Sequence, residues 1–123
     1  ETCRSRVEMM KRLEGKKNPY SFGLYERGTY SVGVPKEPGC KSGLCVEWIG
    51  LRLLGSVAPD RIRYTPDAAK AVALAQNGGA VVFVKPMAVS QIRRAVSAVG
   101  LLPPKSTYFF PKIATGLVFK SLA

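Results

Sequence analysis

The sequence TPDAAKAVALAQNGGAVVFV occupies residues 65–84, and it decides the fold class. Thr65, Pro66 and Asp67 supply a capping hydroxyl, a proline for the first helical position and an acid for the first turn, so a helix is predicted to begin here. The Ala-rich stretch continues this helix up to the glycines at 78–79. Residues 80–84 form an uninterrupted apolar run, which is typical of an interior strand covered on both faces.

The neighbouring segments extend this alternation of helix and strand. A short strand is predicted over 62–64, a helix over 89–99 with Arg93 and Arg94 facing solvent, and a closing strand over 117–119. Alternating helices and strands predict an α/β fold with a mixed β-sheet, and an α+β fold is the alternative.

The first half of the chain adds a helix over 1–14, a β-hairpin over 22–34 and a largely buried helix over 44–54. The hairpin is expected to turn at Glu26-Arg27-Gly28. The chain is therefore predicted to be a single domain over 1–123, in which a mixed sheet with a hairpin packs against about four helices.

Length and composition limit the function classes. With 123 residues, 46% of them hydrophobic, the chain can bury one core. It has no apolar run of membrane-spanning length, and its start, Glu1-Thr2-Cys3-Arg4, does not resemble a signal peptide. A cytoplasmic protein without a membrane partner is expected. Nineteen Lys and Arg against eight Asp and Glu give a net charge of +11, which favours anionic partners, although a merely solvated basic surface is the alternative.

Three cysteines and no histidine argue against a metal site. Cys3, Cys40 and Cys45 do not supply the four ligands of a structural zinc site. Free thiols are predicted for an intracellular protein, and a Cys40–Cys45 disulfide remains an alternative.

The irregular stretch 103–116 is the strongest candidate for a site. It combines lysines, hydroxyls and a glycine with a frame of prolines and aromatic residues, a combination that suits a phosphate or carboxylate. It lacks the glycines of a nucleotide P-loop. Alternatively, the aromatic residues anchor the stretch to the core and the lysines face water. The predicted anion-binding residues are Lys105, Ser106, Thr107, Lys112, Thr115 and Gly116.

This same stretch carries a resemblance. The run from Pro103 to Gly116, continuing into Leu117-Val118, resembles the signature M-P-x-K-S-T-x-F-x-P-K-x-x-T/S-G-L-V of the conserved prokaryotic family known as domain of unknown function 1015. The sequence departs from the family pattern at Leu102, where Met is usual, and at Met87, where a capping Thr or Ser is common. Further matches lie at Asn18-Pro19, Tyr64-Thr65, Asp67, Gly78, Phe83 and Pro86.

The resemblance implies that the chain is the C-terminal part of a larger protein. Family members carry an upstream D-G-H-H-R-Y-E-T motif, and Glu1-Thr2 matches its end. The motif is similar to one in ParB-like proteins and free-serine kinases, where it serves nucleotide-dependent phosphoryl transfer. The full-length protein would then be phosphotransferase-like, with a nucleotide as the expected cofactor and a phosphorylated small molecule or nucleotide as ligand. This chain would contribute a basic wall to a site completed by its partner, the N-terminal part, and would be catalytically inert alone.

Two other function classes remain open. A nucleic-acid-binding module is favoured by the charge and by Tyr108, Phe109 and Phe110, which can form a stacking surface beside lysines. A structural or oligomerisation domain would pack its hairpin and the helix around Trp48 against the N-terminal part or another copy of the chain, as in a homo-oligomer.

Overall fold

A β-hairpin lies at the centre of the fold. The computed structural model describes residues 1–36 and 39–102, and in it β2 (Phe22–Glu26) pairs with β3 (Thr29–Gly33). The two residues between them, Arg27 and Gly28, have φ values of 49° and 80°. Positive φ at both positions is the property of a type I′ turn, whose twist matches that of the flanking strands. The predicted hairpin and its turn are therefore confirmed.

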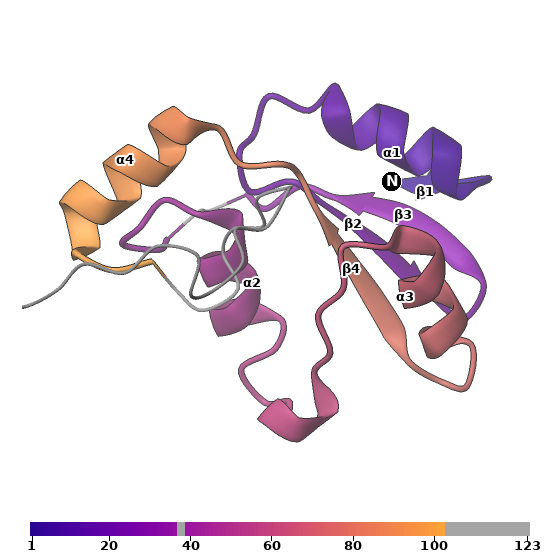
Figure 1. Ribbon diagram of the computed structural model, residues 1–123. Helices are drawn as coiled ribbons and strands as arrows, with labels where there is room; N and C mark the ends of the chain where they lie inside the picture. The colour runs from indigo at the N-terminus through magenta and orange to yellow at the C-terminus, as the bar shows by residue number, and fades with distance from the viewer. Residues whose placement is uncertain (37–38, 103–123) are drawn as a thin grey trace, which may run out of the picture.

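Among the described residues, two further strands extend the hairpin to a four-stranded sheet in the order β1-β3-β2-β4 (Figure 1). β1 (Thr2–Cys3) pairs with β3, and β4 (Ala80–Val84) pairs with β2. The predicted α/β class and single small domain are confirmed. The sequence predicted a mixed sheet, but all the pairings among the described residues are antiparallel. The reason is that β4 lies beside a strand of the hairpin that runs opposite to it.

The described residues also form four α-helices and a short 3₁₀ helix (Figure 1). α4 follows the end of β4 and lies to the side of the sheet, with Arg93 and Arg94 exposed as predicted. Throughout the part of the chain that the structure describes, no helix has the length and apolarity needed to cross a membrane. The helices are α1 (Arg6–Glu14), α2 (Cys45–Arg52), the 3₁₀ helix η1 (Pro59–Arg61), α3 (Ala68–Ala75) and α4 (Val89–Val99).

The main core lies between one face of the sheet and the helices α1 and α3. Met9 and Leu13 of α1 are almost completely buried, and Ala75 of α3 joins the same apolar cluster. Gly23 of β2 allows this close approach, because a Cβ atom there would lie 2.7 Å from the sulfur of Met9. The strands contribute Cys3, Tyr25, Val32 and Phe83 to the cluster.

α2 packs near the opposite face of the sheet through two aromatic rings. The rings of Phe22 and Trp48 stack with their centroids 5.8 Å apart. A Cβ atom at Gly33 would lie 2.5 Å from the Phe22 ring, so glycine provides the space that this ring occupies. The two layers of helices thus place the start of α2 near the end of β4, where the candidate site lies.

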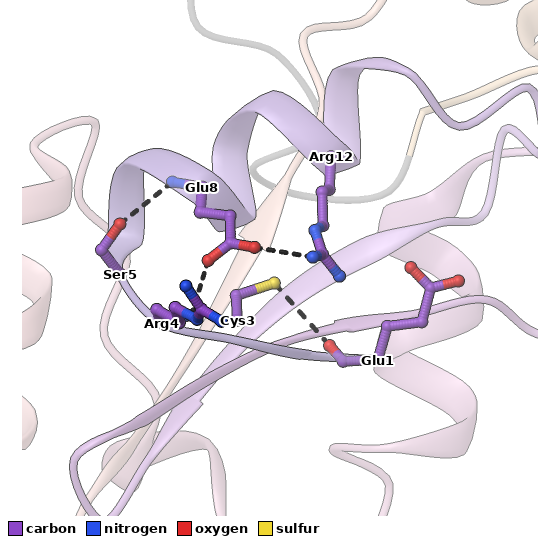
Figure 2. A network of polar contacts seen from close by, with 6 residues as sticks. All are labelled: Glu1, Cys3, Arg4, Ser5, Glu8 and Arg12. Atoms are coloured by element: carbon purple, nitrogen blue, oxygen red, sulfur yellow. Dashed lines mark hydrogen bonds and ion pairs between the residues drawn. The ribbon is translucent and has the colours of Figure 1, made fainter.

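A network of polar contacts holds the first turn of α1 (Figure 2). The Ser5 hydroxyl accepts a hydrogen bond from the amide of Glu8, and the Glu8 carboxylate accepts one from the amide of Arg4. Arg12, one turn later, forms an ion pair with Glu8 at 2.6 Å. The bond from the Glu8 amide to Ser5, the N-cap residue, satisfies an amide that the first turn of a helix leaves without a partner, and the bond from the Arg4 amide holds the chain just before the helix. The helix predicted over 1–14 therefore begins at Arg6, because residues 2–3 pair with β3 instead.

The sequence between α2 and α3 differs from expectation. Residues 62–64, predicted as a strand, directly follow η1 and pair with no strand of the described sheet, although the backbone of Ile62 is extended. α3 begins after Asp67 instead of Thr65, because the Asp67 carboxylate accepts hydrogen bonds from the amides of Ala69 and Lys70. The Thr65 hydroxyl instead accepts a hydrogen bond from the Asp67 amide.

Two segments that were predicted to be buried, β4 and α2, are more exposed in the structure. β4 is the outermost strand of the described sheet, with Phe83 buried and Val84 42% exposed, so the prediction of an interior strand covered on both faces is wrong. α2, expected to be largely buried, leaves Leu51 exposed. Apolar runs do not distinguish a strand with one covered face from one with two. The strand predicted over 117–119 lies outside the described residues.

Candidate functional site

The anion-binding residues predicted from the sequence lie outside the part of the chain that the structure describes. This holds for the whole stretch 103–116, including its aromatic residues. The described residues form a different basic site at the end of β4. Lys105, Ser106, Thr107, Lys112, Thr115 and Gly116 therefore remain predictions.

A cleft of about 240 Å³ lies where three distant segments meet, and we call it the Lys85 cleft. Lys17 comes from the loop between α1 and β2, and Lys85 directly follows β4. Gln91 of α4 adds a third polar side chain to the lining, and Cys45 and Val46 of the first turn of α2 also line the cleft. None of the described lining residues is acidic. The described lining also includes Pro19, Leu44, Cys45, Val46, Val84, Pro86 and Met87.

Lys85 is held in place by two backbone carbonyls. Its ammonium group donates hydrogen bonds of 2.9 Å to the carbonyl oxygens of Lys16 and Asn18. A lysine ammonium has three N–H donors, so one remains for a ligand. Both partners are neutral, and neither described ion pair of the molecule involves Lys85. The site therefore keeps a half-buried positive charge.

The loop that carries Lys17 is fixed by Asn18. The Asn18 side-chain amide donates to the carbonyl of Pro35, and its oxygen accepts from the amide of Tyr20 at 2.8 Å. Together with the two bonds from Lys85, these contacts determine the path of the loop beside the cleft. The position of Lys17 is thus set by contacts to Lys85, after β4, and to Pro35, after β3, although its own side chain is exposed.

The start of α2 lines the cleft through Leu44, Cys45 and Val46. Leu44 is the N-cap residue, and no side chain forms a capping hydrogen bond there. Uncapped amides and the positive end of the helix dipole favour an anion, especially beside cationic side chains. Glu47, the acid of the first turn, accepts hydrogen bonds from the hydroxyl and the amide of Ser42. These bonds lower the pKa of Glu47, and its carboxylate is not part of the described lining.

Cys45 lines the cleft but is not an activated nucleophile. Its thiol donates to the carbonyl of Tyr20 at 3.4 Å. Burial raises the pKa of Cys45 to about 11, and the opposing effect of the Lys85 charge is smaller. Because the thiolate is the reactive form of cysteine, the protonated Cys45 thiol is unreactive at neutral pH. All three cysteines are free thiols in the structure.

Slow alkylation of Cys45 is the expected consequence. The thiol pKa rises from 9.0 to about 11, so the thiolate fraction at pH 8 falls about a hundredfold. In the Cys3→Ser/Cys40→Ser variant, iodoacetamide should label Cys45 about a hundredfold more slowly in the folded protein than in urea. Mass spectrometry over time measures both rates. Equal rates in the folded and unfolded protein would contradict the raised pKa.

Comparison with known proteins does not assign this site. No protein-family model, curated protein or solved structure matches the chain. Among the residues that the structure describes, no group of three or more His, Cys, Asp or Glu side chains has the proximity needed to hold a metal ion. Sequence reasoning missed Lys17 and Lys85, although each stands at the end of a predicted element: Lys85 after the apolar strand, Lys17 after the first helix.

Proposed function

We propose that this chain binds a small anionic ligand, with a phosphate or carboxylate group, in the Lys85 cleft. The observation that carries the proposal is the meeting of two lysines and an uncapped helix start in a cleft whose described lining contains no acid. An anion there would accept charge-assisted hydrogen bonds from the ammonium groups and neutral bonds from backbone amides. The net charge of +11 would favour the approach of such a ligand.

Size and chemistry both favour binding over catalysis. The cleft volume of about 240 Å³ is below the roughly 300–1,000 Å³ of sites for drug-sized ligands, which suits a small metabolite. The nucleophile that lines it, Cys45, is protonated at neutral pH because burial raises its pKa. The proposal is therefore that this domain holds and orients an anion, and that any acid–base chemistry is supplied by residues elsewhere.

The wider functional proposal rests on the sequence resemblance. Membership of the family known as domain of unknown function 1015, a phosphotransferase-like full-length protein and the basic stretch 103–116 all remain proposals. They are compatible with the Lys85 cleft, since both sites would bind phosphate through lysine. The cleft proposal stands without them, because it depends only on the described residues.

Phosphate binding to the Lys17→Gln variant tests the proposal. Calorimetric titration of the 123-residue chain with inorganic phosphate at low ionic strength should show binding. Replacing Lys17 removes one charge-assisted hydrogen bond of about 1.5–3 kcal/mol, so affinity should fall about ten- to a hundredfold. Lys17 is exposed, and the melting temperature should therefore hardly change. Titration with acetate distinguishes a carboxylate site from a phosphate site.

The matched control is Lys11→Gln. Lys11 is an exposed lysine of α1 that does not line the cleft. Its substitution therefore removes the same charge without removing a contact to the ligand. Equal weakening in both variants would mean that net charge alone attracts phosphate, and the cleft proposal would fail. Absence of phosphate and acetate binding in the unmodified chain would also refute it.

A further inference from the structure

A second basic surface lies at the start of α3, away from the Lys85 cleft, and we call it the Tyr64 groove. Its lining shares no residue with that of the cleft. It is an open groove of about 430 Å³, larger than the cleft and within the range of sites for drug-sized ligands. The described residues that line it are Arg63, Tyr64, Thr65, Pro66, Lys70 and Leu74.

The chemistry of the groove combines an accessible aromatic ring with positive charge. Tyr64 is 64% exposed, an unusual position for a large amphipathic side chain that would normally contribute buried area. Arg63 precedes it and Lys70 lies on α3, and both are exposed. Within residues 1–36 and 39–102, neither of the two ion pairs involves these cations. Both charges are therefore available to a ligand.

The backbone explains why the ring is exposed. Residues 62–64 pair with no strand of the described sheet, and they lead directly into the turn that begins α3. The Asp67 carboxylate, the nearest acid in sequence, caps α3 through the amides of Ala69 and Lys70 and does not line the groove. The cap orients the start of the helix that carries Lys70, so the cations and the ring are presented by one locally ordered segment.

We propose that the Tyr64 groove binds a nucleotide unit, with the base stacked on Tyr64 and its phosphate bound by Arg63 and Lys70. An aromatic face beside basic side chains is the arrangement by which proteins bind single-stranded nucleic acid without base specificity. The same chemistry serves a free mononucleotide. The proposal is independent of the Lys85 cleft, because the two sites share no lining residue.

Fluorescence anisotropy of a short labelled oligothymidylate tests the proposal, with unlabelled AMP as competitor. Stacking on an aromatic side chain contributes enough that Tyr64→Leu should weaken oligonucleotide binding about five- to 150-fold. Tyr64→Phe keeps the ring and should bind as the unmodified chain does. Because Tyr64 is mostly exposed, both variants should keep the melting temperature. Displacement by AMP at comparable concentration would identify a free nucleotide as the ligand, and resistance to AMP a single strand.

Charge variants distinguish binding in the groove from a general effect of net charge. Arg63→Gln and Lys70→Gln should each weaken binding and flatten its salt dependence, as expected for a lost phosphate contact. Arg93→Gln removes an equal charge from exposed α4, and Lys11→Gln removes one from exposed α1, and neither residue lines the groove or the cleft; both variants should have little effect. The proposal is overturned if Tyr64→Leu binds the oligonucleotide like the unmodified chain, or if Arg93→Gln weakens binding as much as Arg63→Gln does. It is also overturned if neither the oligonucleotide nor AMP binds.

Discussion

Leu13→Ala is expected to lower the free energy of unfolding by about 2–5 kcal/mol. Leu13 is only 1% exposed, and it belongs to the apolar cluster that joins α1 to the sheet. Removing its branched side chain loses transfer free energy and leaves a cavity in this cluster, because a packed core relaxes only in part. Urea unfolding followed by circular dichroism measures the loss.

The matched control for this prediction is Leu51→Ala. Leu51 is a leucine in helix α2, but it is 61% exposed, so the same substitution should change the unfolding free energy by no more than about 0.5 kcal/mol. Similar losses in the two variants would mean that the cluster around α1 is not the main core. A loss confined to Leu51→Ala would mean that α2 is covered in solution.

Lys85→Met is expected to affect both stability and ligand binding. The substitution keeps the length of the side chain but removes the donors that hold the carbonyls of Lys16 and Asn18. A hydrogen bond to a charged group is worth about 1.5–3 kcal/mol, so the unfolding free energy should fall by about this amount. Phosphate binding should fall by at least tenfold at the same time, because the variant also loses the charge in the cleft.

Comparison with Lys11→Met separates these effects from the general cost of removing a lysine. Lys11 is exposed, so its substitution should leave both the urea midpoint and the phosphate affinity nearly unchanged. If Lys85→Met unfolds at the same urea concentration as the unmodified chain, Lys85 does not hold the α1–β2 loop. If it also binds phosphate normally, Lys85 is not a ligand-binding residue.

Local signals in the sequence determined most of the elements. The hairpin could be predicted because Arg27-Gly28 lies between alternating apolar residues, and the structure has a type I′ turn there. Gly100, with φ 80°, ends α4 where predicted. These features depend on the conformations that a few adjacent residues can adopt, and so they can be predicted from the sequence without knowing the rest of the fold. The predicted helix start near Thr65 differs from the observed one only because Asp67, and not Thr65, is the N-cap residue of α3.

Pairing and burial were decided by the tertiary structure. The apolar run 80–84 correctly predicted a strand, but not that it would pair with β2 and leave Val84 exposed. The strand predicted over 62–64 is unpaired in the described sheet, because hydrogen-bond partners for a strand must come from distant parts of the chain. An apolar residue pattern describes what can be buried, whereas the other elements decide how much of it is covered.

The candidate sites also differ in whether the sequence or the tertiary structure reveals them. Sequence reasoning selected residues 103–116, where lysines and hydroxyls lie close together along the chain. The Lys85 cleft escaped it because Lys17, Cys45 and Lys85 come from three segments that meet only after β4 pairs with β2. Charge and residue type are properties of the sequence. The convergence of those charges on one point is a property of the folded chain, since the sheet pairing and the two bonds from Lys85 bring the segments of Lys17 and Lys85 together.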